Sequence, residues 1–128
     1  MAHSLLAACA RLDAPCTVHV AVGTDIIHQH PSFDAAATAE GSLRDFHTLK
    51  EHLRLLDSGG VVMNIGSAVI IPEVFLKALT LVRNLGHDVK NFSTVNMDFI
   101  QHYRPVTNVV RRPPSTGGRG YTLTGHHE

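Results

Sequence analysis

Residues 59–73 read Gly-Gly-Val-Val-Met-Asn-Ile-Gly-Ser-Ala-Val-Ile-Ile-Pro-Glu, and this stretch decides the predicted fold. The run 61–65 is short, apolar and rich in β-branched residues, which predicts a strand buried in a sheet. A Gly-Ser turn follows, and a helix is predicted over 71–85 with Pro72 in its first turn. A strand that leads through a turn into a helix is the unit from which parallel sheets are built.

Elements of the same kinds are expected on both sides of this unit. The patterns predict helices over 2–12 and from Ser42 to Leu56, strands over 16–22, 92–99 and 121–124, and a proline- and glycine-rich loop over 104–120. Their order predicts the α/β class, as a three-layer Rossmann-like domain with a mostly parallel sheet. Because the strands are few and no closing helix is visible, we expect a single α/β domain over 1–128 that is part of a longer domain or is completed by oligomerisation.

Composition limits the class of protein and its partners. The chain has 128 residues, of which 44% are hydrophobic and 17% charged, with a formal net charge of zero. These values are typical of one globular domain and give no electrostatic reason to expect nucleic acid. The apolar runs are shorter than the ~18 residues of a membrane span, so we expect no membrane partner. Two cysteines make a disulfide framework unexpected, and the predicted location is cytoplasmic.

Candidate ligand-binding residues follow three of the predicted strands. In a parallel sheet, ligands bind outside the carboxyl ends of the strands. Gly66 allows close approach of a ligand to the backbone, and Ser67 with free amides near a helix start favours a phosphate or a carboxylate. A plain turn that needs small residues is the alternative. The candidate cofactor-binding residues at these ends are Gly23, Thr24, Asn64, Gly66, Ser67, Asn96 and Asp98, and Glu73 is a further candidate on the next helix.

The segment 25–30 carries the candidate catalytic groups. Asp25, His28 and His30 could act as polar or acid/base groups. They are also ligand types that zinc accepts, with His102 as an additional ligand, so a metal site is a second interpretation. A pair of loop histidines that contacts a ligand or a subunit is a third. No complete metal-ligand set is visible in the sequence, and no metal residue is assigned.

Residues 15 to about 100 resemble the later half of deoxyhypusine synthase-like proteins, including uncharacterised bacterial members. The likeness is carried by the Thr24-Asp25 loop, by the Gly-Gly-Val-Val strand at 59–62 and by the stretch from Asn64 to Leu79. It implies an NAD-binding fold related to that of sirtuins, a site that includes Asp25, and oligomers with sites between subunits. The chain has no tryptophan and so lacks the Trp-Gly-Lys motif of the synthase's lysine nucleophile.

The leading hypothesis is therefore an NAD- or nucleotide-binding domain of a deoxyhypusine synthase-like protein. It would be a homo-oligomer that binds a small-molecule ligand, and any reaction would be a transfer to or from an amine or another small polar substrate. One alternative is a metal-dependent hydrolase, with zinc held by Asp25, His28 and His30. The other is a non-catalytic domain that serves assembly.

Overall fold

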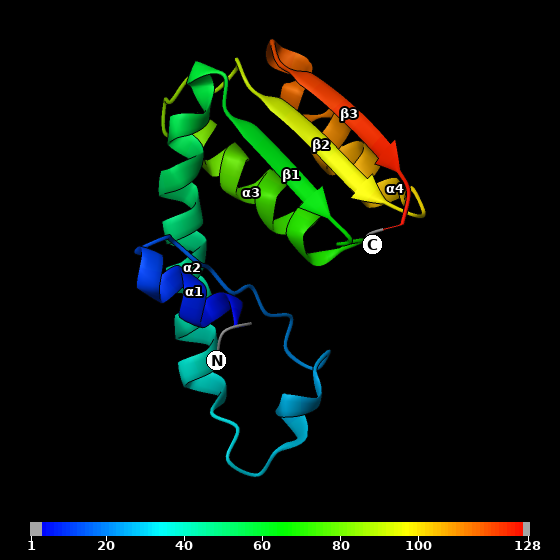
Figure 1. The fold of residues 1–128 in the computed structure, drawn as a ribbon. Helices are drawn as coiled ribbons and strands as arrows, with labels where there is room; N and C mark the ends of the chain where they lie inside the picture. Colours follow the sequence, from blue (N-terminus) through cyan, green and yellow to red (C-terminus); the bar gives the residue numbers. More distant parts are fainter. Residues whose placement is uncertain (1–3, 127–128) are drawn as a thin grey trace.

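A computed structural model describes residues 4–126 (Figure 1). The N-terminal third holds α1, a short 3-10 helix and α2, and the remainder alternates strands with helices. The elements are α1 (Leu5–Leu12), η1 (Ile26–Gln29), α2 (Ala35–Leu53), η2 (Arg54–Ser58), β1 (Val61–Ile65), α3 (Ile70–Asn84), β2 (Ser93–Asp98), α4 (Tyr103–Pro105), η3 (Val106–Arg111), η4 (Pro113–Thr116) and β3 (Arg119–Thr124). The predicted helix over 2–12 is present from Leu5, and its residues Ala2 and His3 lie outside the described range.

The three strands form an open parallel sheet in the order β1-β2-β3. Met63 pairs with Val95, and Val95 pairs with Tyr121, so residues of equal depth form rows across the sheet. Helix α3 connects β1 to β2, and the helical segment 103–116 connects β2 to β3. The α/β class and the parallel, Rossmann-like sheet are therefore confirmed.

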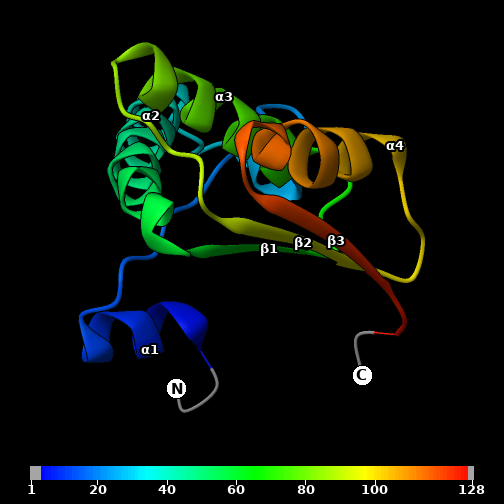
Figure 2. The same ribbon diagram turned by 90° about the horizontal axis from the view of Figure 1, so that it is seen from above.

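The hydrophobic core lies between one face of the sheet and a layer of helices (Figure 2). Helix α3 supplies half of the buried core residues, because its apolar side chains recur at helical spacing and face the strands. Val109 packs against it from η3. The buried hydrophobic residues are Leu53, Phe75, Ala78, Leu79, Val82, Val89, Phe92 and Val109.

The strand predicted over 16–22 is absent, which corrects the expectation from its β-branched pattern. The segment is extended but lies against α2 instead of joining the sheet. The N–H of Val18 donates to the Asp45 carboxylate at 2.7 Å, and the N–H of Val20 donates to the Ser42 hydroxyl at 3.3 Å. Side chains of the helix thus replace the backbone partners that a neighbouring strand would supply.

Helix α2 begins seven residues before the predicted Ser42, at Ala35. Asp34 is its N-cap, since its carboxylate accepts from the N–H of Ala37 at 2.9 Å. The alanine-rich stretch after Asp34 has high helix propensity, and a single glycine at position 41 does not interrupt the helix. None of the helices described within residues 4–126 has both the length and the apolarity to cross a bilayer.

The segment 104–120, predicted as a loop, is largely helical. Pro105 lies in the first turn after the N-cap His102, where a proline costs no hydrogen bond. The chain continues as the π-helical turn η3, and Pro113 then begins η4. The prolines therefore lie in the first turns of helices, whereas their abundance predicted a loop.

Asp57 joins the end of the α2 region to the residues just before β2. Its carboxylate accepts from the N–H groups of Lys90 at 2.6 Å and Asn91 at 3.0 Å. These hydrogen bonds favour the ionised form and lower the pKa of Asp57 from its usual 3.8. Asp57 therefore stabilises the folded chain at neutral pH.

We expect Asp57→Ala to lower the melting temperature at pH 7. Because the folded-state pKa is depressed, the stabilisation is present above the unfolded value of 3.8 and is lost as the pH falls below it. The difference between wild type and variant should narrow in thermal melts recorded from pH 7 down to pH 3. Glu40→Ala, which removes only an exposed ion pair with Arg44, is the control, and a constant gap over this range would contradict the assignment.

Candidate functional site

The carboxyl ends of all three strands meet at one edge of the sheet, and a cavity of about 310 Å³ lies there. Each strand contributes to its wall. The lining residues are Ile65, Met97, Asp98, Leu123, Thr124, Gly125 and His126. Among the predicted residues, Asp98 lies directly in this wall, and its side chain is buried.

A ladder of buried amides runs beneath the same edge. The amide of Asn64 on β1 donates to Asn96 Oδ1 on β2 at 2.6 Å, and the amide of Asn96 donates to Gln101 Oε1 at 2.7 Å. The Gln101 amide donates to the Leu123 carbonyl at 3.1 Å and to Thr124 Oγ1 at 3.2 Å. One chain of hydrogen bonds therefore connects the ends of all three strands.

The ladder also reaches the turn between β1 and α3. The second hydrogen of the Asn64 amide is donated to the Ser67 carbonyl at 2.9 Å. The Ser67 hydroxyl accepts from the N–H of Ile71 in the first turn of α3 at 3.2 Å. Gly66, with a φ of 66°, makes the turn tight enough for both contacts. Asn64, Gly66, Ser67 and Asn96, four of the candidate cofactor-binding residues, are thus brought together by hydrogen bonds and by this turn.

Two oxygens near this ladder lack partners. Asn64 Oδ1 and Thr94 Oγ1 are buried and make no hydrogen bond within the described chain. A buried acceptor without a donor costs about 1–3 kcal/mol. A buried water molecule would satisfy such oxygens.

Glu73 serves a different purpose from the predicted contact with a ligand. Its carboxylate accepts from Lys77 at 2.6 Å and from the buried Asn108 at 2.8 Å, and it lies 3.4 Å from Arg104. The Lys77 ammonium, helped by Arg104 and Asn108, holds the pKa of Glu73 below its usual 4.5. Glu73 therefore ties α3 to the helical segment that precedes β3.

The predicted loop at 23–25 lies away from this edge, because the preceding segment is not a strand of the sheet. Figure 1 shows η1 and its flanking loops below the sheet, beyond the first turns of α2. Asp25 is the N-cap of η1, and its carboxylate accepts from the N–H of Ile27 at 3.2 Å. If residues 16–22 had formed a fourth parallel strand, Asp25 and Ser67 would follow strands of the same sheet at the same edge. Because this strand is absent, the two residues do not share an edge.

His28 holds the same loop together. Its Nδ1 accepts from the N–H of Gly23 at 3.0 Å and from the N–H of Asp25 at 3.2 Å, and its ring meets Phe33 edge-on. Accepting at Nδ1 puts the ring proton on Nε2, which is buried and has no partner within the described residues. Thr24 closes the turn by donating its hydroxyl to the Ala21 carbonyl at 2.6 Å.

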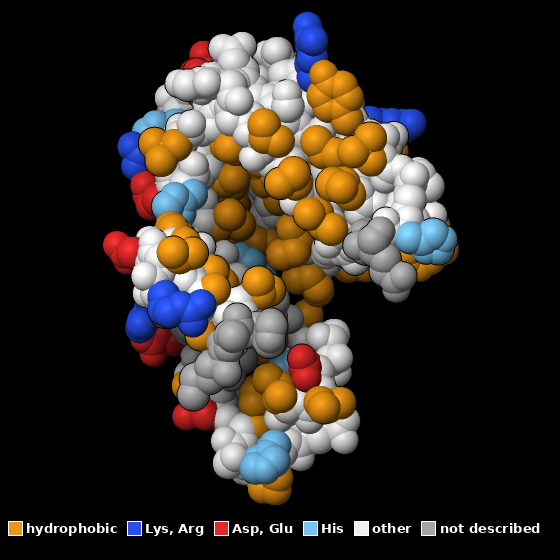
Figure 3. Space-filling model, in the orientation of Figure 1, with side chains coloured by type: hydrophobic (Ala, Val, Ile, Leu, Met, Phe, Trp, Pro, Cys, Tyr) orange, Lys and Arg blue, Asp and Glu red, His pale blue; other side chains and the backbone are white. Residues whose placement is uncertain are grey.

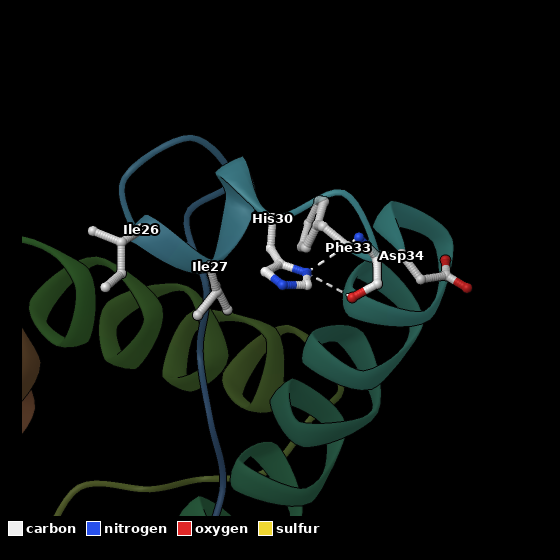
Figure 4. A pocket seen from close by; sticks show the side chains of 6 residues that line it. Ile26, Ile27, His30, Phe33 and Asp34 are labelled. Atoms are coloured by element: carbon white, nitrogen blue, oxygen red, sulfur yellow. Dashed lines mark hydrogen bonds between the residues drawn. The ribbon is translucent and has the colours of Figure 1, made fainter.

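His30 lines a second cavity, of about 460 Å³, between η1 and the start of α2 (Figure 4). Its imidazole lies between the side chains of Ile27 and Phe33, and its Nδ1 contacts the Ser32 hydroxyl at 2.7 Å. Asp34 also lines the cavity, but its carboxylate caps α2. The polar groups here are thus engaged in holding the loop.

The histidines do not converge on a metal-binding geometry with Asp25. Among residues 4–126, no group of three or more histidine, cysteine, aspartate or glutamate side chains is arranged to hold a metal ion. The carboxylate of Asp25 and the Nδ1 atoms of His28 and His30 each serve a local turn. The cavity at the sheet edge is therefore the better candidate site.

Sequence reasoning missed the part of the site that β3 supplies. Thr124 ends the last predicted strand and Gly125 follows it, at the same edge as Asp98 at the end of β2, so the rule for strand ends would have included them. Gln101 lies in a loop, and no local sequence pattern predicts that its amide donates a hydrogen bond to β3.

Comparison of the chain with protein-family models, with curated proteins and with solved structures gave no match.

Proposed function

We propose that the chain binds a nucleotide of the NAD class at the carboxyl edge of its sheet. The observation that carries this proposal is the convergence of three parallel strand ends on one cavity. In open α/β sheets, this edge is where ligands bind. The resemblance to deoxyhypusine synthase-like proteins supports the same class of ligand.

The chemistry of the donor set fits the parts of a nucleotide. The Asp98 carboxylate and Thr124 hydroxyl in the wall suit the hydroxyl groups of a ribose. Ile65, Met97 and Leu123 supply the apolar surface that a base requires.

The size of the cavity favours one half of a dinucleotide. Its volume of about 310 Å³ lies at the lower end of the roughly 300–1,000 Å³ range of small-molecule sites. Each half of a dinucleotide-binding fold holds one mononucleotide, so AMP and ADP-ribose are informative ligands besides NAD.

The proposal extends to binding and leaves the transfer reaction without assigned groups. Asp25, His28 and His30 were the predicted catalytic residues, but the loop that holds them is separate from the cavity. A transferase acting on an amine would need a nucleophile or base at the sheet edge, and Asp98 and His126 are the titratable groups that line it.

Isothermal titration calorimetry with NAD, ADP-ribose and AMP tests the proposal. We expect saturable binding that Gly125→Leu weakens at least tenfold, because a side chain at position 125 meets no atom within 4 Å of its Cβ and extends into the cavity region. Gly41→Leu, at a site that is equally open but lies on α2, is the matched control and should bind as wild type does. Absence of binding at millimolar concentrations of all three ligands would refute the proposal.

A further inference from the structure

One face of the sheet is open and apolar. Figure 2 shows α2, α3 and the helical segment before β3 on one side of the strands, and Figure 3 shows apolar side chains gathered over the other side. Two complete rows cross this open face, Met63–Val95–Tyr121 and Ile65–Met97–Leu123. On the outer strands, Val61, Met63, Ile65, Tyr121 and Leu123 are between 47% and 61% exposed.

An exposed apolar sheet face is unusual in an α/β protein. Parallel sheets have both faces covered, and their strands are apolar on both sides for that reason. The exposed parts of the five side chains total roughly 500 Å², within the range of about 300–600 Å² for the largest and often functional apolar patch of a monomer. Arg119, at the start of β3, is the one charged residue of the three strands that alternates onto this face.

The same chain has an apolar helix without a partner. Helix α1 buries none of its residues, and Leu5 and Leu12, which are two turns apart on one side, are 81% and 77% exposed. Figure 2 shows α1 on the side of the sheet opposite to α2 and α3, which is the side to which the open sheet face is turned. Its eight residues span about 12 Å, which is long enough to cross three strands spaced about 4.8 Å apart.

We propose that the chain forms a two-fold symmetric dimer in which α1 of each copy packs across the row Met63–Val95–Tyr121 on the open sheet face of the other, beside the row that lines the nucleotide cavity. The open sheet face lacks a covering helix, and α1 lacks a surface to pack on. In a two-fold symmetric dimer, α1 of each copy covers the sheet face of the other copy. The part of the sheet face outside the cavity and α1 together offer roughly 600–700 Å² of apolar surface per copy, which reaches the lower end of about 600 Å² per partner for a specific interface. Arg11 and Arg119 lie at the ends of these surfaces, so no charge is buried at the centre.

Sedimentation equilibrium and light scattering test the dimer with three double variants. Met63→Lys/Tyr121→Lys places charges on the sheet face outside the nucleotide cavity, and Leu5→Lys/Leu12→Lys places them on α1. We expect wild type to be a dimer and both variants to be monomers with unchanged circular dichroism, since all four positions are exposed. Leu55→Lys/Leu85→Lys, at exposed leucines outside both surfaces, should remain a dimer.

Mixing the two interface variants distinguishes helix exchange from other dimers. The mixture contains one intact α1 and one intact sheet face on different chains, so it should form a heterodimer that neither variant forms alone. A monomeric wild type, or a dimer that survives the α1 substitutions, would overturn the proposal. Nucleotide binding by the monomeric sheet variant is measured separately, so that failure of the dimer and failure of the nucleotide site can be told apart.

Discussion

Gly120→Ala is expected to destabilise the protein more than an alanine substitution at any of the other glycines described. A Cβ at position 120 would lie 1.9 Å from the carbonyl oxygen of Val110 and 2.7 Å from its carbonyl carbon. Both are backbone atoms of Val110 in the π-helical turn η3, so no side chain can rotate to make room. The helical segment must separate from the sheet, or the strand must leave its register.

We expect Gly120→Ala to lower the free energy of unfolding by about 3 kcal/mol or more, which places it among severe overpacking substitutions. Urea denaturation followed by circular dichroism measures this loss. The control is Gly41→Ala on α2, where a Cβ meets nothing within 4 Å and the helix should gain about 0.5–1 kcal/mol. Equal stability of the two variants would show that the close approach of β3 to Val110 does not exist in solution.

Asn96→Leu is expected to have the second largest effect, through the amide ladder. Asn96 is 0% exposed and is the member of the ladder that joins β1 to Gln101. A leucine of similar volume fills the site but leaves the Gln101 carbonyl oxygen and one hydrogen of the Asn64 amide without partners. Unsatisfied buried groups of this kind cost about 1–3 kcal/mol each.

We therefore expect Asn96→Leu to lower the free energy of unfolding by about 2–3 kcal/mol. Amide hydrogen exchange should quicken at Ser67 and Leu123, at the two ends of the ladder, more than in the middle of α3. Asn84→Leu, at the exposed end of α3, is the matched substitution and should leave stability nearly unchanged. If exchange quickens evenly along the chain, the ladder does not position the edge of the sheet.

Asn96→Leu and Gly125→Leu together sharpen the binding experiment. Asn96→Leu alters the residues that support the cavity without entering its wall, whereas Gly125→Leu enters the wall without disturbing the ladder. A loss of nucleotide affinity in both, with lowered stability in the first alone, is the pattern that a positioned ligand site predicts.

Local sequence determined the central elements of this protein. The stretch 59–73 predicted β1, the Gly66-Ser67 turn and α3, because its β-branched run, its glycine turn and its early proline each satisfy one backbone geometry. The patterns at 92–99 and 121–124 predicted β2 and β3 for the same reason. The α/β class and the parallel sheet followed from the order of these elements.

Tertiary contacts decided what local patterns leave open. The segment 16–22 has a strand pattern, but whether it pairs with a strand or with side chains of α2 depends on residues more than 20 positions away. The prolines of 104–120 are compatible with loops and with helix starts, and the packing of η3 against β2 and β3 selects the helix. The amide ladder and the open sheet face likewise exist only after the strands are assembled, because hydrogen bonding and burial between distant residues cannot be read from either residue alone.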